Sequence, residues 1–320
     1  MKSFEGRIAV VTGGGTGMGR ELVRQLAAEG CHVAMCDVSA ESMDETKVLC
    51  DDAPAGTLVS TFVADVSDEQ QMLAFAAAVA EAHTADHINL LFNNAGIGGG
   101  GSFILDDRSE WDKTFAVCWG GVYNGTRAFM PMLLASAEGH VVNTSSVNGF
   151  WASIGPRMPH TAYSAAKFAV KGFTEALITD FRQNAPHLMA SVVMPGHIGT
   201  SIVINSSRIL GRDPKDLTDD QVAQLREQLP RQGFDVSGAS DEEIRLGLQM
   251  QGEMFRDAAP TSAAEAAAII LEGVRNEQWR ILVGDDAERL DELVRETPEH
   301  AYEPSFMTRL QGEGVFAFMQ

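Results

Sequence analysis

Residues 7–19 read RIAVVTGGGTGMG, an apolar run that leads directly into a glycine-rich turn. The run at 7–12 is short and rich in β-branched side chains, which is typical of a buried parallel strand. Residues 20–30 follow with apolar side chains at helical spacing and with Gly30 at the end. Strand, glycine turn and helix in this order predict the first half of a dinucleotide-binding βαβ unit.

The glycines of this turn have a physical role in the predicted unit. Gly13, Gly17 and Gly19 would let the backbone turn sharply and come close to a pyrophosphate. The helix that follows offers free N–H groups and the positive end of its dipole to the same anion. An ordinary glycine-rich loop is the alternative, but the flanking strand and helix favour nucleotide binding.

The second predicted strand, residues 32–37, ends in an acidic side chain about 20 residues beyond the turn. A carboxylate at Asp37 can accept hydrogen bonds from the adenosine ribose hydroxyls and would repel a 2′-phosphate. Val38 and Ser39 carry no positive charge, and Thr16 is neutral where an NADP-binding turn often has a basic residue. We therefore expect NAD rather than NADP as the cofactor; a surface aspartate at a strand end is the alternative.

Tyr163 and Lys167 lie four residues apart in an alanine-rich stretch, YSAAK, that should be helical. This spacing places the phenol and the ammonium on one face of the helix. A neighbouring cation favours phenolate, so we expect the pKa of Tyr163 to fall from about 10 toward the range of a general base. Such a pair suits the removal of a proton from an alcohol, whereas a solvated pair is the alternative.

The chain resembles the short-chain dehydrogenase/reductase family, in its compact single-domain branch. Six motifs appear in the family order: TGGGTGMG at 12–19, Asp65-Val66, NNAG at 93–96, Ser145-Ser146, YSAAK at 163–167, and PGHIGT at 195–200. The resemblance implies an α/β fold with a doubly wound, Rossmann-like parallel sheet of about seven strands. It also implies hydride transfer between NAD(P) and a carbonyl or alcohol, in a homodimer or homotetramer.

The same resemblance implies roles for residues of these motifs. Those expected to bind the cofactor are Gly13, Gly15, Thr16, Gly17 and Met18 at the pyrophosphate, Asp65 and Val66 at the adenine, Asn94 and Ala95 through their backbone, and Ile198 and Thr200 at the nicotinamide carboxamide.

Three residues are expected to carry catalysis in this resemblance. Tyr163 is the acid/base, and Lys167 lowers its pKa and holds the nicotinamide ribose. Ser146 hydrogen-bonds the substrate oxygen, while its neighbour Ser145 has a structural role.

Two departures from the family pattern bear on the site. Cys118 stands where the family has an asparagine that helps to hold a proton-relay water. A thiol is a weak donor and acceptor, so we expect the water to rest on a backbone carbonyl or another side chain and activity to persist. We prefer a small buried Cys118 to a reactive thiol. The second departure is a long segment at 150–160 before Tyr163.

This segment and the last motif supply candidate residues for a substrate pocket. They are Trp151, His160 and His197. For the two histidines, a supporting or surface position is the alternative.

The motifs run through the first 200 residues, so we expect one NAD-binding domain over 1–320 rather than two. Residues 201–260 are polar and too long for a simple connection, and their helical patterns predict an inserted lid over the substrate site. Its apolar side chains would either line the pocket or pack the lid onto the body. The tail at 285–320 has one predicted helix and an apolar end.

Composition restricts the class of protein. The chain has 320 residues, 45% of them hydrophobic, a net charge of −20 and four cysteines. The charge disfavours nucleic acid and anionic membranes as partners, and no apolar run is long enough to cross a bilayer. No metal-ligand set is evident, no signal segment starts the chain, and reduced thiols indicate a cytoplasmic protein.

These observations predict an NAD-dependent dehydrogenase that oxidises a fairly hydrophobic secondary alcohol. A ketone reductase on similar substrates is the first alternative. A catalytically weak NAD-binding sensor or scaffold is the second, because the family asparagine is missing.

Overall fold

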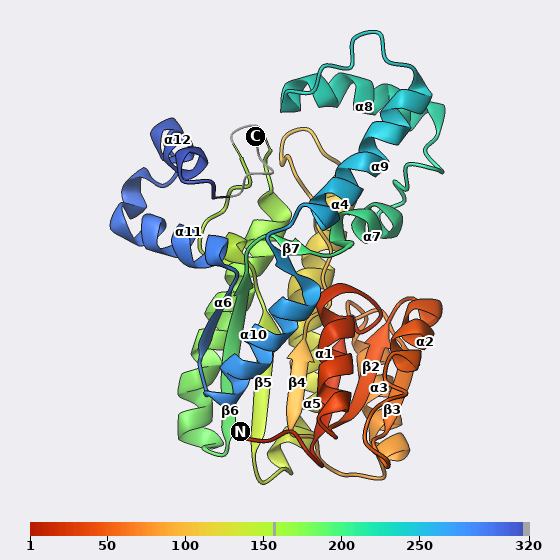
Figure 1. Ribbon diagram of the computed structural model, residues 1–320, viewed down its shortest axis with the longest axis vertical. Coiled ribbons are helices and arrows are strands. Elements are labelled where there is room, and N and C mark those ends of the chain that lie inside the picture. The colour runs from red at the N-terminus through yellow and green to blue at the C-terminus, as the bar shows by residue number, and fades with distance from the viewer. Residues whose placement is uncertain (156–157, 316–320) are drawn as a thin grey trace.

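The computed structural model describes residues 1–155 and 158–315. Its main sheet has seven parallel strands in the order β3-β2-β1-β4-β5-β6-β9, with helices on both faces (Figure 1). The strands are β1 (Ile8–Thr12), β2 (His32–Asp37), β3 (Val59–Val63), β4 (Leu90–Asn93), β5 (Gly139–Thr144), β6 (Leu188–Pro195) and β9 (Arg280–Val283). The predicted doubly wound α/β sheet is confirmed.

Each face of the sheet buries its own apolar core. Alternate residues of a strand point to opposite faces, so Val11 of β1 enters one core and Val10 the other. The first core is covered by α1 (Gly17–Ala28) and α10 (Ala263–Arg275). The second is covered by α3 (Glu69–His83), α5 (Gly121–Leu134) and α6 (Thr161–Asn184).

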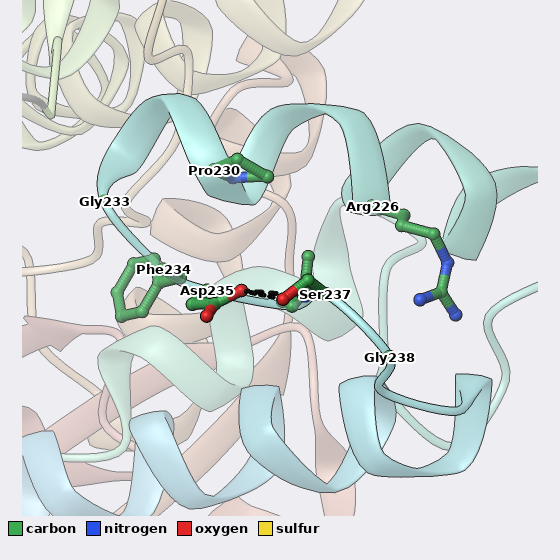
Figure 2. A pocket seen from close by; sticks show the side chains of 8 residues that line it. Arg226, Pro230, Gly233, Phe234, Asp235, Ser237 and Gly238 are labelled. Carbon is green, nitrogen blue, oxygen red and sulfur yellow. Dashed lines mark hydrogen bonds between the residues drawn. The ribbon is translucent and has the colours of Figure 1, made fainter.

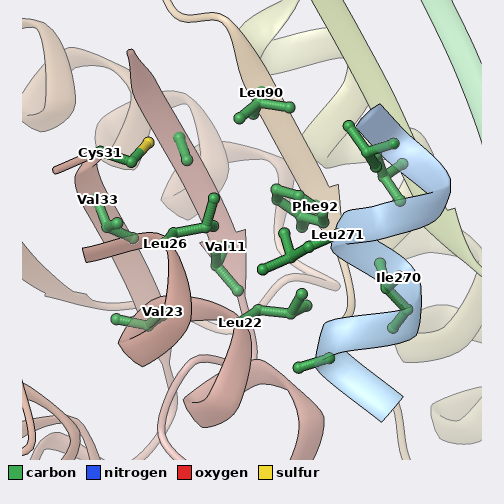
Figure 3. Close-up of a cluster of buried hydrophobic side chains, with 14 of the residues drawn as sticks. Val11, Leu22, Val23, Leu26, Cys31, Val33, Leu90, Phe92, Ile270 and Leu271 are labelled. Carbon is green, nitrogen blue, oxygen red and sulfur yellow. The ribbon is translucent and has the colours of Figure 1, made fainter. Parts of the chain in front are cut away.

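Figure 3 shows the first core, in which α1 and α10 meet over the middle of the sheet. Leu22 and Leu26 of α1 lie against Val11 and Phe92, and Ile270 of α10 closes the cluster. This packing fixes the start of α1 relative to the carboxyl ends of β1 and β4. It therefore fixes the position of the glycine turn.

The strand order reverses direction between β1 and β4, which have β2 and β5 as their other neighbours. In open parallel sheets, ligands bind outside the carboxyl ends of the strands at such a switch point. The predicted motifs after β1, β4, β5 and β6 all follow a strand at this end. The fold thus gathers segments that are distant in sequence into one crevice.

The segment 201–260 forms three helices, α7 (Ile202–Ile209), α8 (Asp219–Gln232) and α9 (Asp241–Asp257). Capping boxes start α8 at Thr218 and α9 at Ser240, which satisfies the first N–H groups of each helix. The short strands β7 (Ile198–Gly199) and β8 (Thr261–Ser262) pair where the segment leaves and rejoins the body. In Figure 1, α8 and α9 extend away from the sheet at the upper right.

The apolar side chains of this segment divide into two groups. Val222, Leu229 and Ile244 are buried between α8 and α9, whereas Met250 and Met254 of α9 are at least half exposed. A shallow pocket of about 540 Å³ lies between the end of α8 and residues 233–238 (Figure 2). None of the residues that line it is a predicted site residue.

The remaining helices complete the two layers and the C-terminal region. They are α2 (Ala40–Val48), α4 (Arg108–Phe115), the π-helical turn η1 (Ala116–Gly120), the 3₁₀ turns η2 (Val147–Gly149) and η3 (Pro298–His300), α11 (Asp285–Glu296) and α12 (Pro304–Gly312). The predicted tail therefore has two α-helices instead of one, and residues 316–320 at its apolar end lie outside the described part of the chain. No helix of the described residues is long and apolar enough to span a membrane.

Trp151 belongs to the core beneath this C-terminal region, so its assignment to the substrate pocket is wrong. Its side chain is fully buried and packs near Phe306 of α12, with ring centroids 5.9 Å apart. The indole N–H donates a hydrogen bond to the carbonyl of Ala301 at 2.8 Å. Trp151 thus anchors the segment before α6 to the C-terminal helices.

We expect Trp151→Phe to lower the free energy of unfolding by about 1–3 kcal/mol, because it leaves a buried carbonyl without its donor. Urea unfolding followed by circular dichroism measures the change. The control is Trp279→Phe, the same substitution at an exposed tryptophan, which should stay within about 0.5 kcal/mol of the wild type. Equal effects of the two substitutions would contradict the anchoring role.

Candidate active site

Tyr163 and Lys167 lie on the first two turns of α6, at the carboxyl end of the sheet. Lys167 is only 2% exposed, and its Nζ donates a hydrogen bond to the carbonyl of Thr144 at 2.8 Å. The same Nζ lies 5.3 Å from the centre of the Tyr163 ring. The i, i+4 spacing therefore brings the ammonium beside the phenol, and the end of β5 fixes the ammonium there.

The serine pair follows β5 and faces α6. Ser145 donates a hydrogen bond to the carbonyl of Lys167 at 2.8 Å, which ties the helix to the strand. The hydroxyl of Ser146 accepts from the N–H of Asn148 at 3.2 Å and hydrogen-bonds Tyr163. Ser146, Tyr163 and Lys167 thus form one cluster, with Ser145 behind it as a structural link.

The electrostatics of the cluster differ from the expectation drawn from the spacing. Burial raises the pKa of Tyr163 above its ordinary value, and the hydrogen bond with Ser146 opposes this rise. Burial also lowers the pKa of Lys167. The pKa of Tyr163 in the protein without cofactor therefore lies above its ordinary value instead of below it, because desolvation of the phenol is the largest effect.

Cys118 lies on η1, the π-helical turn between α4 and α5. Its side chain is fully buried, and the thiol donates to the carbonyl of Ile97 at 3.1 Å. A Cβ added at Gly96 would lie 3.5 Å from Lys167 Nζ and 3.7 Å from Cys118 Sγ. Cys118 therefore faces the same space as Lys167, as a small buried group.

We expect Cys118→Asn to change kcat by less than about tenfold, because Lys167 is held by the Thr144 carbonyl and not by Cys118. Steady-state rates of the two proteins with one substrate give this ratio. Cys118→Ala, which removes the weak thiol donor, is the matched variant and should also keep its activity. A rise in kcat by orders of magnitude in Cys118→Asn would show that the native site lacks a working relay.

The two candidate histidines have different surroundings. The ring of His160 packs on the ring of Tyr163 with centroids 4.6 Å apart, and burial lowers the pKa of His160 to about 4. His197 instead joins three segments: its backbone N–H donates to Asp286 at 2.7 Å, and its Nε2 lies 2.6 Å from the carbonyl of Phe255. His160 therefore touches the catalytic cluster, whereas His197 links the strand end to α9 and α11.

The glycine turn has the backbone that a dinucleotide cradle requires. Gly13 and Gly17 have φ of +67° and +55°, in the left-handed region that favours glycine. A Cβ at Gly19 would collide with the carbonyl of Gly13. Thr12 Oγ1 accepts hydrogen bonds from the backbone N–H groups of Asn94 and Ala95, at 3.0 and 3.1 Å. The loops after β1 and β4 are thus joined at the switch point.

The start of α1 is suited to bind a pyrophosphate. Thr16 occupies the N-cap position, yet within the described residues its side chain makes no capping hydrogen bond to the helix. The first N–H groups of a helix have no partner inside the helix, and they attract an anion. The residues present therefore fit the phosphates of a dinucleotide.

Asp37 lies at the end of β2 beside this turn. Its carboxylate accepts hydrogen bonds from the N–H groups of Gly15 at 3.0 Å and Ser39 at 3.1 Å. These two bonds hold the carboxylate at the edge of the glycine turn. In this position the carboxylate can accept hydrogen bonds from ribose hydroxyls and would repel a 2′-phosphate.

Asp65 has a partner that the motif alone did not indicate. Lys113 of α4 binds its carboxylate at 2.7 Å, and Ser67 donates to the other oxygen. These donors hold the pKa of Asp65 below its usual range, although burial opposes them. Val66 is buried against Gly121. Lys113 is 48 residues away in sequence, so no local signal points to it.

The last motif closes the crevice from the side of β6. Ile198 is buried in the first core, and the N–H of Thr200 donates to the carbonyl of Ile198 at 2.8 Å. The side chain of Thr200 lies 3.1 Å from the position of a Cβ built on Gly17. The glycine turn and the segment after β6 therefore face each other across the crevice.

The comparisons with known proteins agree with this geometry. The family model described as short chain dehydrogenase matches residues 7–209. The SadH protein of Mycobacterium tuberculosis is 34% identical over 92% of each chain, and levodione reductase of Leifsonia aquatica is 35% identical over 67% of this chain and 76% of its own. A solved short chain dehydrogenase/reductase from Burkholderia phymatum, in complex with NAD, has a TM-score of 0.76 and 29% identity, covering 95% of this chain and 98% of its own.

Proposed function

Because the chain belongs to the short-chain dehydrogenase/reductase family, we propose that it is an NAD-dependent dehydrogenase that oxidises hydrophobic secondary alcohols. The observation that carries the proposal is the cluster of the buried Ser146 and Lys167 with the partly buried Tyr163 at the carboxyl end of the sheet. This cluster combines a phenol, a hydroxyl that hydrogen-bonds it, and an ammonium fixed by a backbone carbonyl.

The proposed roles follow from these contacts. Ser146 holds the substrate hydroxyl next to Tyr163, and the Tyr163 oxygen takes the hydroxyl proton. Lys167 stabilises the resulting negative charge on the phenol from the adjacent turn of α6. Bound NAD would accept the hydride from the carbinol carbon.

The choice of NAD rests on Asp37. Its carboxylate, held by the N–H groups of Gly15 and Ser39, can accept from two ribose hydroxyls. A 2′-phosphate would place like charges together, which costs several kcal/mol. The nearest basic side chain along the turn, Arg20, is already bound to Glu45 at 2.7 Å and to the carbonyl of Gly15.

An apolar substrate is supported by the loop between β4 and α4. Its tip carries three large apolar side chains, Phe103, Ile104 and Leu105, which are 77%, 91% and 53% exposed. The base of the loop is bonded to the start of α6, where the N–H of Thr161 donates to the carbonyl of Gly101 at 3.1 Å. The apolar tip therefore follows directly after a backbone contact with Thr161, which lies two residues before Tyr163.

Reduction of a ketone by the same residues is the second candidate function. The raised pKa of Tyr163 favours the protonated phenol, which is the form that donates a proton to a ketone oxygen. The similarity to levodione reductase supports the same direction. Oxidation and reduction use one site, so the two proposals share every residue.

A cofactor titration followed by a substrate panel tests the proposal. NADH and NADPH are titrated by fluorescence, and secondary alcohols and ketones of increasing apolar size are then assayed with each cofactor. We expect NADH to bind more tightly than NADPH and turnover to rise with apolar size. Binding of NADH with no turnover of any alcohol or ketone would instead favour a nucleotide-binding sensor or scaffold.

A further inference from the structure

Helix α7 lies across the glycine turn and is fixed to both loops that form the cofactor crevice. The side-chain amide of Asn205 donates a hydrogen bond to Thr16 Oγ1 at 3.2 Å, over a sequence separation of 189 residues. The hydroxyl of Ser206 accepts from the N–H of Gly98 at 2.7 Å. Neither residue belongs to a sequence motif described above, and both follow Thr200 on the segment that faces Gly17.

Asn205 contacts Thr16 where the glycine turn leads into helix α1. Thr16 is the N-cap residue of α1 and has extended backbone, with φ −146° and ψ 170°. Instead of capping its own helix, its hydroxyl is the partner of Asn205. The amide of Asn205 therefore lies beside the start of α1, where the first N–H groups of the helix can bind an anion.

The pyrophosphate of a dinucleotide would meet few positive charges here. Arg20, the cation nearest to the turn in sequence, binds Glu45 and the carbonyl of Gly15. The chain as a whole carries a net charge of −20. With Arg20 engaged, the backbone N–H groups of the turn and the side-chain amide of Asn205 are the donors beside the start of α1, and a hydrogen bond from a donor to a charged phosphate contributes to affinity.

We propose that Asn205 is a cofactor-binding residue that donates its amide N–H to the pyrophosphate from the side of α7. This inference rests on the proposed nicotinamide cofactor and extends its site to a helix outside the glycine turn. The amide carries two N–H donors, so Asn205 can bind the phosphate and keep Thr16 as a partner. Helix α7 then closes the crevice over the bound phosphates.

The test is the binding of three probes to the full chain: NADH, ADP-ribose and adenosine. Asn205→Ala should weaken NADH and ADP-ribose by about tenfold or more, the usual loss for a hydrogen bond to a charged group. Adenosine, which has no pyrophosphate, should bind unchanged. Ser207→Ala is the control, because Ser207 lies on α7 and, among the residues that the structure describes, its hydroxyl donates within the helix, to the carbonyl of Val203.

Asn205→Asp distinguishes two roles of Asn205: binding the phosphate, or only holding α7 to Thr16 by a hydrogen bond. A carboxylate can still accept a hydrogen bond from the Thr16 hydroxyl. If Asn205 only holds α7 to Thr16, the aspartate should therefore restore the binding of NADH. Against a pyrophosphate, the same carboxylate is repulsive, and NADH should bind even more weakly than to Asn205→Ala. Unfolding midpoints of the variants confirm that each protein is folded.

Two results overturn the inference: unchanged binding of NADH to Asn205→Ala, or tighter binding to Asn205→Asp than to Asn205→Ala. In both cases the wild type still binds NADH, so the proposed dehydrogenase function stands. Failure of the wild type to bind either NADH or NADPH would instead remove the proposed function and this inference together.

Discussion

Tyr163→Phe should lower kcat for the oxidation of a secondary alcohol by about 10²- to 10⁴-fold, the range that a positioned acid/base contributes. The substitution removes only the oxygen that exchanges the proton. The ring that packs against His160 and lies beside Lys167 remains. Steady-state kinetics give the rate, and NADH fluorescence should show cofactor affinity within about threefold of the wild type.

The control is Tyr123→Phe, the same substitution at an exposed tyrosine of α5, which should leave kcat unchanged. Retention of more than about a tenth of wild-type kcat by Tyr163→Phe would exclude Tyr163 as the acid/base. A loss of cofactor affinity of the same size as the loss of rate would mean that the hydroxyl serves binding rather than proton transfer.

The pH dependence of the wild-type rates also tests whether Tyr163 is the acid/base. Oxidation needs the phenolate of Tyr163, and burial raises the pKa of its phenol. The rate of oxidation should therefore keep rising as the pH increases above neutrality, whereas the rate of ketone reduction, which needs the phenol, should stay constant and fall only as the pH approaches the raised pKa. In Tyr163→Phe, both dependences should disappear from the residual rate.

Asp37→Ser should shift the ratio of kcat/KM for NADP to that for NAD by about 10²- to 10³-fold toward NADP. Removing the carboxylate removes the like-charge contact with a 2′-phosphate, which is worth several kcal/mol. Serine keeps a hydroxyl acceptor near the N–H groups of Gly15 and Ser39. Initial rates with each cofactor at low concentration give the two values of kcat/KM.

Asp44→Ser is the matched control, because Asp44 is an exposed acid on α2 close to the same edge of the protein. It changes the net charge equally and should leave the cofactor ratio within about twofold. A wild-type enzyme that already prefers NADP, or an unchanged ratio in Asp37→Ser, would refute the role of Asp37.

The fold could be predicted because each of its signals is local. The strand, glycine turn and helix at 7–30 and the motifs after four later strands are all read within a few residues. Parallel strands bring their carboxyl ends together at one edge, and the family resemblance implied that Ser146, Tyr163 and Lys167 act together. The helices at 218–257 were also predictable from their acidic starts and caps.

The remaining errors come from contacts between residues that are far apart in sequence. Trp151 was expected in a pocket, but its partners Ala301 and Phe306 lie about 150 residues later. Nothing in the sequence pairs Lys113 with Asp65. The direction of the Tyr163 pKa shift likewise does not follow from the i, i+4 spacing, because burial, which is the largest cause, is a property of the whole fold.

The measurement that tests the proposed function most directly is the transfer of deuterium from a secondary alcohol labelled at its carbinol carbon. The alcohol is incubated with the protein and NAD, and the nucleotide is analysed by mass spectrometry. We predict deuterium in the NADH formed by the wild type and almost none with Tyr163→Phe. A wild-type protein that binds NADH but transfers no deuterium from any labelled alcohol would contradict the assignment.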